Sequence, residues 1–241
     1  MVTLPFPPLI EASWVERRKR FMLDVRLPDG TEFTAHCPNT GPMTGLPRPG
    51  APVLLSVSDN PKRKYAHTLE AVKVDGIWVG ANTQNPNRLM ARLGAAHTPP
   101  FPPKGKVRAE VRYGKAERID FLVENEGEPP LFVEIKNVHL VDHPGEASFP
   151  DCITTRGAKH LDALAHEVAA GNAAMLVYVI QRGDVDRFRL ARHIDAAYGE
   201  AFDRAVAAGV RMVALCCNVS PEGIDVRGEI PILEPVLGAA A

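Results

Sequence analysis

The first eighty residues contain short runs in which apolar and polar residues alternate, separated by turn-forming residues. Five of these runs are predicted strands: residues 21–28, 30–38, 52–59, 65–74 and 76–81. Asp29-Gly30 lies between the first two runs and favours a tight hairpin. Five short strands in this length are typical of a small antiparallel barrel, of which the OB-fold is the commonest type. We therefore expect residues 1–82 to form an OB-like, five-stranded β-barrel that binds nucleic acid.

Beyond residue 82 the pattern changes to strands alternating with helices. A short helix is expected from Asn85 to Gly94, followed by a proline-rich connector. The predicted elements after it are strands at 107–114, 118–124 and 131–140, a helix at 154–171, a buried strand at 174–181, a helix at 195–209 and a buried strand at 211–220. This order resembles the core of restriction-endonuclease-like nucleases. We expect residues 83–241 to form such a mixed sheet flanked by helices, and the chain to be of mixed α/β class.

The composition of the chain indicates the class of protein and the cellular compartment to expect. The 241 residues are 45% hydrophobic and 24% charged, and the sequence lacks an uncharged apolar run long enough to span a bilayer. The N-terminal stretch lacks the pattern of a signal peptide. The four cysteines include no C-x-x-C pair, which argues against a zinc site or a disulfide framework. We expect a cytoplasmic protein without a membrane partner.

Positive charge is concentrated in the first part of the chain. Residues 1–90 carry eleven Lys or Arg against eight Asp or Glu, whereas the remainder is acidic. Two clusters stand out, and their members Arg18, Lys19, Lys62, Arg63 and Lys64 are candidate phosphate contacts. Solvated surface is the alternative interpretation. The polar loop at 36–42 contains Asn39 and is either a structured turn or a nucleic-acid-binding loop.

The segment FVEIKN, residues 132–137, combines a buried strand pattern with charged residues on its other face. If the hairpin is symmetric about Gly127, Asp120 lies opposite Glu134, and directly opposed side chains project from the same face. Two carboxylates so close repel each other unless a cation lies between them. Mg²⁺, or Mn²⁺ in its place, is often held by one or two carboxylates plus water and phosphate oxygens. Lys136 is on the same face and is placed to stabilise developing phosphate charge.

Two further features extend this candidate site. Glu110, in the preceding strand, is a candidate third metal ligand, with an ordinary surface glutamate as the alternative. The predicted helix start at 154–160 carries Arg156, Lys159 and His160, which we expect to contact a phosphodiester together with the helix N-terminus. Positive charge is unfavourable at a helix N-terminus, so either Asp151 or a bound phosphate is expected to compensate it.

The chain also resembles the sugar fermentation stimulation proteins (SfsA) of bacteria and archaea. The resemblance rests on five ordered blocks: HCPNTGPM, ANTQNPNRL, EVRYGKAERIDFL, VEIKNVHL and FPDCITTRGAKHLDAL. It implies an OB-like domain joined to a nuclease domain of the PD-(D/E)xK type, and a link to DNA binding and sugar metabolism. It also implies that Asp120, Glu134 and Lys136 are the catalytic positions, and that the second signature contains Arg156, Lys159 and His160.

Two functions follow as hypotheses. The first is a Mg²⁺-dependent nuclease whose barrel binds the strand that is cleaved. The second is a DNA-binding regulator of sugar metabolism genes without catalytic activity. The paired carboxylates favour the nuclease, since a binding module has no need of them. The sequence predicts nucleic acid, with DNA first, as the partner. It leaves open DNA or RNA, single or double strand, and the oligomeric state, for which a homodimer is one option.

Overall fold

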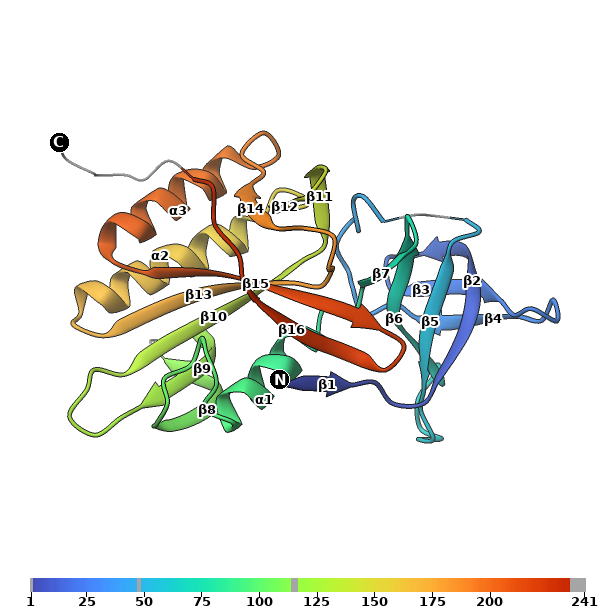
Figure 1. Cartoon of the computed structure of the whole chain (residues 1–241), viewed down its shortest axis with the longest axis horizontal. Coiled ribbons are helices and arrows are strands. Elements are labelled where there is room, and N and C mark those ends of the chain that lie inside the picture. The colour runs from blue at the N-terminus through green and yellow to red at the C-terminus, as the bar shows by residue number, and fades with distance from the viewer. Residues whose placement is uncertain (1, 47–48, 114–116, 235–241) are drawn as a thin grey trace.

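The computed structural model describes residues 2–46, 49–113 and 117–234. A barrel of short strands forms one end of the molecule, and a long mixed sheet with three helices forms the other (Figure 1). Residues 114–116, which include the expected end of one strand and part of the third resemblance block, lie outside the described residues. The arrangement confirms the expected mixed α/β class with an N-terminal OB-like barrel.

The barrel is built from consecutive antiparallel strands that close on themselves. Its strands are β2 (Leu9–Arg18), β3 (Met22–Arg26), β4 (Glu32–His36), β5 (Pro52–Val57) and β6 (His67–Val74). They follow the order β4-β3-β2-β5-β6, and a pairing of His36 in β4 with Thr68 in β6 closes the ring. β7 (Ile77–Gly80) extends the sheet beyond β6 and lies outside the closed ring. The inward-facing residues form a compact apolar cluster that includes Trp14, Leu23 and Leu69.

One barrel strand was missing from the sequence prediction. β2 takes the place in the ring that residues 76–81 were expected to fill. Its register to β3 shifts between Trp14 and Glu16, so a bulge interrupts the alternation of apolar and polar residues. β2 ends at Arg18, inside the basic run of residues 17–20, so the sequence pattern does not mark where the strand ends. The five-stranded barrel is therefore correct, but its membership is not the one expected from the local pattern.

The second sheet is mixed and has seven strands in the order β1-β16-β15-β13-β10-β9-β8. The strands are β1 (Thr3–Pro5), β8 (Lys106–Tyr113), β9 (Glu117–Glu124), β10 (Leu131–Val138), β13 (Ala173–Ile180), β15 (Arg211–Ser220) and β16 (Gly223–Glu229). β13 is parallel to both β10 and β15, and the other neighbours are antiparallel. β1 precedes the barrel in sequence but pairs with β16 in this sheet.

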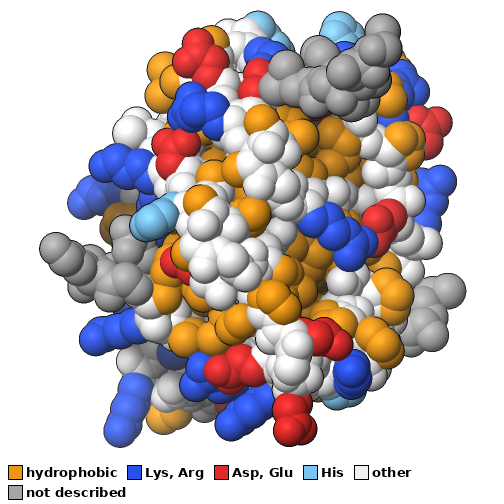
Figure 2. Space-filling view, turned by 90° about the vertical axis from the view of Figure 1, so that its left-hand side faces the viewer, with side chains coloured by type: hydrophobic (Ala, Val, Ile, Leu, Met, Phe, Trp, Pro, Cys, Tyr) orange, Lys and Arg blue, Asp and Glu red, His pale blue; other side chains and the backbone are white. Residues whose placement is uncertain are grey.

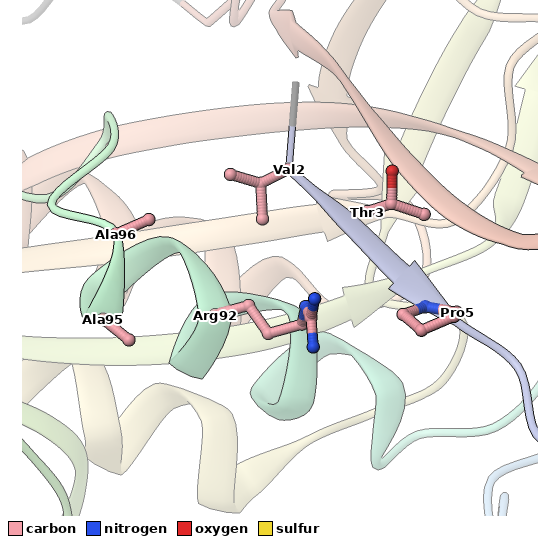
Figure 3. Close-up of a pocket in the computed structure, with 6 residues that line it drawn as sticks. All are labelled: Val2, Thr3, Pro5, Arg92, Ala95 and Ala96. Atoms are coloured by element: carbon pink, nitrogen blue, oxygen red, sulfur yellow. The ribbon is translucent and has the colours of Figure 1, made fainter.

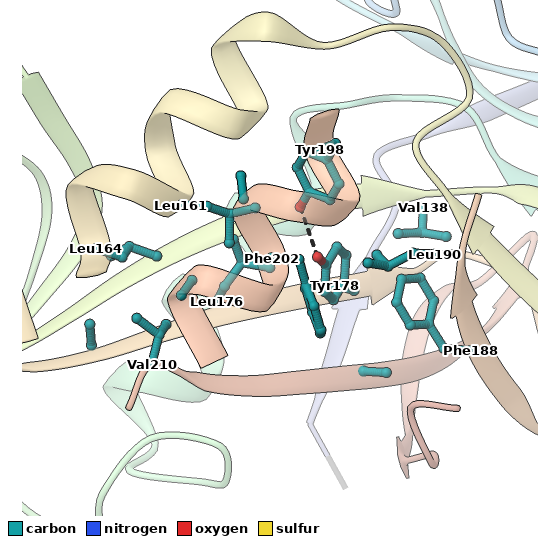
Figure 4. Packing of buried hydrophobic residues seen from close by; sticks show 14 of the residues in the cluster. Val138, Leu161, Leu164, Leu176, Tyr178, Phe188, Leu190, Tyr198, Phe202 and Val210 are labelled. Atoms are coloured by element: carbon teal, nitrogen blue, oxygen red, sulfur yellow. Dashed lines mark hydrogen bonds between the residues drawn. The ribbon is translucent and has the colours of Figure 1, made fainter. Parts of the chain in front are cut away.

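Helices cover both faces of the mixed sheet (Figure 1). α2 (Thr155–Ala169) and α3 (Ala196–Ala208) pack on one face, and α1 (Asn85–Ala95) packs on the other. Leu161, Phe202 and Tyr178 meet in the core beneath α2 and α3 (Figure 4). There the hydroxyls of Tyr178 and Tyr198 are 2.7 Å apart, so two buried polar groups satisfy each other.

A small third sheet contains β11 (Leu140–His143), β12 (Glu146–Phe149) and β14 (Arg187–Leu190). Two of its strands, β11 and β12, lie between β10 and α2 in the chain, and its third strand follows β13. These four-residue strands were not predicted, because such short segments carry too little periodicity to be recognised. The chain leaves β12 at Phe149 and reaches α2 within a few residues, which places the start of α2 beside β10.

The barrel and the mixed sheet meet through a polar contact. Gly80 N–H donates to the carbonyl of Gln181 at 2.8 Å, and a Cβ on Gly80 would lie 2.4 Å from Gln181 Oε1. Only glycine allows this approach. Gln181 Nε2 in turn donates to the Asn82 carbonyl at 3.2 Å and to Asn137 Oδ1 at 2.5 Å. The contact therefore connects the barrel, the start of α1 and strand β10.

Candidate active site

The β9–β10 hairpin has the register expected from the sequence. Val133 pairs with Phe121, and the two preceding pairs follow the same symmetry about residue 127. One further step brings Asp120 level with Glu134. Ile135 and its neighbours are buried, and β10 lies in the interior of the sheet. The two carboxylates therefore come from adjacent strands at the same height.

Asp120 is held by two hydrogen bonds. Its Oδ2 accepts from the backbone N–H of Ile135 at 2.7 Å, and its Oδ1 accepts from Asn87 Nδ2 at 2.8 Å. Burial, and then the negative charge of Glu134, raise the pKa of Asp120 to about 6. The hydrogen bonds from Ile135 and Asn87 act in the opposite direction. Asp120 is thus a carboxylate that is costly to ionise beside its neighbour.

Glu134 is only 5% exposed and is surrounded by positive or donating groups. Its Oε1 accepts from Lys136 Nζ at 2.7 Å and is hydrogen-bonded to His160 Nδ1. Burial acts to raise the pKa of Glu134, but the bond to His160 and the charge of Lys136 outweigh it, so the pKa is lowered. The pKa values of the two carboxylates move apart, and Glu134 is the one that stays ionised.

His160 connects this group to the start of α2. Its Nε2 accepts from Arg156 Nε at 3.2 Å, and Lys136 Nζ lies 3.1 Å from its Nδ1. Thr154 caps α2 by accepting the Gly157 N–H at 3.1 Å. The helix start therefore faces the carboxylates with Arg156 and His160. Lys159 is exposed and does not line the site.

The acid that supports this helix start was not anticipated. Asp195 Oδ2 accepts from the backbone N–H of Thr154 at 2.7 Å, and Asp195 Oδ1 accepts from Tyr198 N–H at 3.0 Å. Asp151, which was expected there as the alternative to a bound phosphate, lies 3.5 Å from the buried His139. Asp195 is 41 residues from Thr154 in sequence, so only the tertiary fold brings it to α2. The correction leaves the positive groups of the first turn directed at the pocket.

Glu110 lies in the same row as the two carboxylates. Ala109 pairs with Phe121 and Val111 with Ile119, which leaves Glu110 level with Asp120 across β8 and β9. Its φ of +55° is in the left-handed region, where a non-glycine residue in a strand is strained. The Glu110 carboxylate is exposed and lies 3.1 Å from Arg118. Glu110 therefore sits at the rim of the site and not beside the buried pair.

These groups open into one polar pocket of about 310 Å³. Its lining comprises Asn87, Glu110, Arg118, Asp120, Glu134, Ile135, Lys136, Thr154, Arg156, Gly157 and His160. Most of the charged lining residues were expected from the sequence, but Asn87 and Arg118 were not. The signal was present, because Asn87 lies in the resemblance block ANTQNPNRL. Its role depends on the packing of α1 against β9, which local sequence does not show.

Asp120 and Glu134 supply two of the oxygen ligands that a hard divalent cation needs. Two carboxylates share one pocket, and burial followed by the charge of Glu134 raises the pKa of Asp120. Among residues 2–46, 49–113 and 117–234, no three His, Cys, Asp or Glu side chains are grouped to hold an ion by themselves. Mg²⁺ is commonly bound by two carboxylates completed by water and phosphate oxygens, so these residues fit such an ion.

The basic residues of the barrel occupy two loops. Arg18 and Lys19 lie at the β2–β3 turn, while Lys62, Arg63 and Lys64 lie between β5 and β6. Loops at these positions flank the ligand face of OB barrels. Arg18 is ion-paired with Asp24 at 2.5 Å, Arg63 donates to Thr68 Oγ1 at 2.8 Å, and Lys64 Nζ lies 5.4 Å from the Tyr65 ring centre.

Asn39 stabilises the loop that contains it through hydrogen bonds. The residue is only 4% exposed, and its Oδ1 accepts from the Gly41 N–H at 2.9 Å. Its carbonyl accepts from Arg17 at 2.7 Å. Of the two interpretations of this loop, the contacts of Asn39 correspond to a structured turn.

Other parts of the surface are less suited to chemistry. A hollow of about 610 Å³ lies between β1 and α1 and is lined by small or apolar residues and Arg92 (Figure 3). At the end of the molecule opposite the barrel, hydrophobic side chains form a central band, and Lys and Arg are interspersed with Asp and Glu (Figure 2). In the described residues, no helix has the length and apolar character needed to cross a membrane.

Comparison with known proteins gives the family. Residues 15–81 match the "SfsA N-terminal OB domain", and residues 84–223 match the "Sugar fermentation stimulation protein RE domain". A sugar fermentation stimulation protein homolog of Rhodospirillum centenum is 49% identical over 223 residues, covering 92% of this chain and 96% of the relative. A homolog of Rhizobium meliloti is 48% identical over 238 residues, covering 96% and 98%.

A solved structure has the same fold. The structure of Pyrococcus furiosus SfsA in complex with Ca²⁺ superposes with a TM-score of 0.87 and 24% identity, covering 96% of this chain and 99% of the other. The two family matches together span both the barrel and the mixed sheet, and the relatives cover nearly the whole chain. On this evidence the chain belongs to the sugar fermentation stimulation protein family.

Proposed function

We propose that this protein is a divalent-metal-dependent nuclease, with Asp120, Glu134 and Lys136 as its catalytic residues. The observation that carries the proposal is the placement of Asp120 and Glu134 at the same height on adjacent strands. Both open into the pocket that also receives Lys136 and the start of α2. Paired carboxylates with a lysine beside a helix N-terminus suit phosphodiester hydrolysis better than binding alone.

The proposed metal site consists of Asp120 and Glu134, with Glu110 as a third carboxylate at the rim. Mg²⁺ is the expected ion, and Mn²⁺ has the same ligand preference. The Ca²⁺ named for the Pyrococcus furiosus relative supports a divalent-ion site in this fold. When bound, the ion would polarise the scissile phosphate and lower the pKa of the attacking water. Ionised Glu134 supplies the permanent negative charge of this site, because its pKa is lowered.

The other residues of the pocket bind the phosphodiester, orient it and stabilise its developing charge. Arg156 and the free N–H groups at the start of α2 bind the phosphodiester and orient it toward Asp120. His160 holds Glu134 in place through its Nδ1, and Glu134 in turn accepts from Lys136. Lys136 stabilises the negative charge that develops on the phosphate as water attacks phosphorus and the ester bond to the leaving oxygen breaks. The basic loops of the barrel hold the strand beyond the pocket, with DNA as the first candidate substrate.

A cleavage assay tests the proposal. Purified protein is incubated with end-labelled single- and double-stranded DNA and RNA in Mg²⁺, Mn²⁺ or EDTA, beside Asp120→Asn and Lys136→Met. Lys106→Met is the matched control, because Lys106 is an exposed lysine of the neighbouring strand β8. We expect metal-dependent products from wild type and Lys106→Met, and losses of about 10²-fold or more in both site variants.

Two outcomes contradict the nuclease. Binding without cleavage by wild type on every substrate would favour the alternative, a non-catalytic DNA-binding regulator. Cleavage that survives in both site variants would show that the reaction does not occur at Asp120 and Lys136.

A further inference from the structure

A second polar pocket lies where the barrel meets the first turn of α1. We call it the junction pocket; its volume is also about 310 Å³. Its lining includes Ser56, Arg63, Thr68, Glu70, Asn82 and Arg88. Most of the lining comes from β5, β6 and the loop between them, and the segment before α1 together with Arg88 of α1 contributes the rest of these residues. The pocket is thus built by both parts of the chain.

Two arginines in this pocket have only neutral partners. Arg63 donates to Thr68 Oγ1 at 2.8 Å, and Arg88 donates to Gln84 Oε1 at 3.0 Å and Asn85 Oδ1 at 3.3 Å. Within the described part of the chain, neither forms an ion pair. Oxygen acceptors that orient a guanidinium without neutralising it leave its charge available to a phosphate.

The interior of the pocket contains a buried carboxylate. Glu70 is 2% exposed, and it accepts hydrogen bonds from Ser56 Oγ at 2.7 Å, Asn82 Nδ2 at 2.9 Å and Asn85 Nδ2 at 2.8 Å. A carboxylate has about four acceptor positions, so these three donors leave one open. The pocket therefore offers an anion-binding edge beside a hydrogen-bond acceptor. A nucleotide has the matching pair of groups, a phosphate and a base edge with N–H donors.

The remaining ionisable groups of the pocket lie toward the barrel. His36 lines it, and burial followed by the positive charge of Arg63 lowers the pKa of its imidazole. Asp59 lies in the loop that carries Arg63. The negative charge of Glu70 and Asp59 reduces the positive potential of the pocket, but the hydrogen bonds of Arg63 and Arg88 go to neutral oxygens, which leaves both guanidinium groups available to a phosphate.

The junction pocket and the candidate active site lie on either side of one helical turn. Asn87 lines the active-site pocket and binds Asp120, while the next residue, Arg88, lines the junction pocket. The first turn of α1 therefore contributes a side chain to each of the two pockets. Single-strand binding commonly combines such a row of cations with pockets or platforms for bases.

We propose that the junction pocket binds one nucleotide of the strand whose phosphodiester lies in the active site. Arg63 and Arg88 hold its phosphate, and the base edge donates to Glu70. This inference rests on the proposed function, since it assumes a nucleic acid substrate. It adds a specific subsite away from the reacting phosphate, and it makes Glu70 a determinant of base preference.

The test measures binding without cleavage. Fluorescently labelled single-stranded DNA and RNA oligonucleotides of increasing length are titrated by anisotropy in EDTA, using wild type, Arg63→Ala and Arg88→Ala. Arg92→Ala is the matched control, because Arg92 is an exposed arginine one turn further along α1 and lines a different hollow. Melting temperatures of all variants show whether each is folded.

We expect wild type and Arg92→Ala to bind longer oligonucleotides more tightly than short ones. Arg63→Ala and Arg88→Ala should lose about tenfold in affinity for the longer ones only, since a hydrogen bond to a charged group is removed. The slope of log affinity against log salt should fall by about 0.7 for each lost phosphate contact. Glu70→Gln should change the ranking of homopolymers of different bases, and an unchanged ranking in the folded variant would remove Glu70 from the subsite.

The failures can be told apart. Arginine variants that bind like Arg92→Ala at every length overturn the subsite, even where wild type cleaves nucleic acid. Length-dependent binding that requires both arginines, without cleavage on any substrate, supports the subsite and overturns the nuclease. A wild-type protein that neither binds nor cleaves any oligonucleotide overturns both proposals.

Discussion

The carboxylate of Asp120 accepts the backbone N–H of Ile135 at 2.7 Å, where the ladder between β9 and β10 ends. The side chain thus takes the bonding position that a backbone carbonyl of β9 would otherwise hold. This satisfies the buried N–H of Ile135 and fixes Asp120 beside Glu134 at the same time. The pairing of β9 with β10 and the proposed chemistry of the pocket therefore depend on the same carboxylate.

Asp120→Asn should stabilise the metal-free protein at neutral pH. The pKa of Asp120 is raised from 3.8 to about 6, so the folded state binds this proton more tightly than the unfolded state. The associated stability is complete below the unfolded pKa and is lost as pH rises through the folded pKa. Removing the charge should raise the free energy of unfolding by about 3 kcal/mol above the folded pKa, and by less in acid. Urea unfolding in EDTA on both sides of pH about 6 measures this difference. An equal effect at both pH values would contradict it.

Divalent-ion affinity should fall in acid because binding requires ionised Asp120. Below the pKa of about 6, the affinity should drop about tenfold for each pH unit. Calorimetric titration with Ca²⁺ measures it, and the proton released on binding should appear as a dependence of the heat on the buffer. Asp120→Asn is the control and should bind weakly with a flat pH profile in this range. A steep profile in that variant would assign the proton to another group.

Asn87→Ala should shift the acid limb of the pH–rate profile to higher pH. Asn87 donates to Asp120 Oδ1 at 2.8 Å, and this bond lowers the pKa of Asp120. Losing a hydrogen bond of about 1 kcal/mol should move the limb by up to about one pH unit. Arg92→Ala, in the same helix, should leave the limb in place. A fall in rate without a shift would mean that Asn87 acts in another way.

Glu110→Gln should weaken divalent-ion binding, and Glu124→Gln should not. Both glutamates form ion pairs with an arginine across β8 and β9, Glu110 with Arg118 and Glu124 with Arg108. Only Glu110 lines the active-site pocket, where its backbone holds a φ of +55°. Loss of one carboxylate ligand should reduce affinity about tenfold or more. Equal affinities for the two variants, measured by calorimetry, would remove Glu110 from the metal site.

The β9–β10 hairpin and its register follow from local sequence alone. The alternation of residues 131–138 and the turn near residue 127 are local features, so they predicted that Asp120 and Glu134 lie level. The same kind of local pattern predicted α2 and its basic first turn, and ordered motifs predicted the family. Local pattern failed at β2, where a bulge breaks the alternation, and at the short strands of the third sheet.

The tertiary structure alone decided which distant residues complete the two pockets. Asn87 meets Asp120, and Asp195 meets Thr154, only because helices α1 and α3 pack against the site. Arg63 and Arg88 line one pocket because the barrel closes and docks on α1. Such contacts arise from packing between elements far apart in the chain, and no period of the local sequence encodes which partners meet. The local sequence pattern thus places the two carboxylates level, and packing between distant elements brings in the groups that orient them.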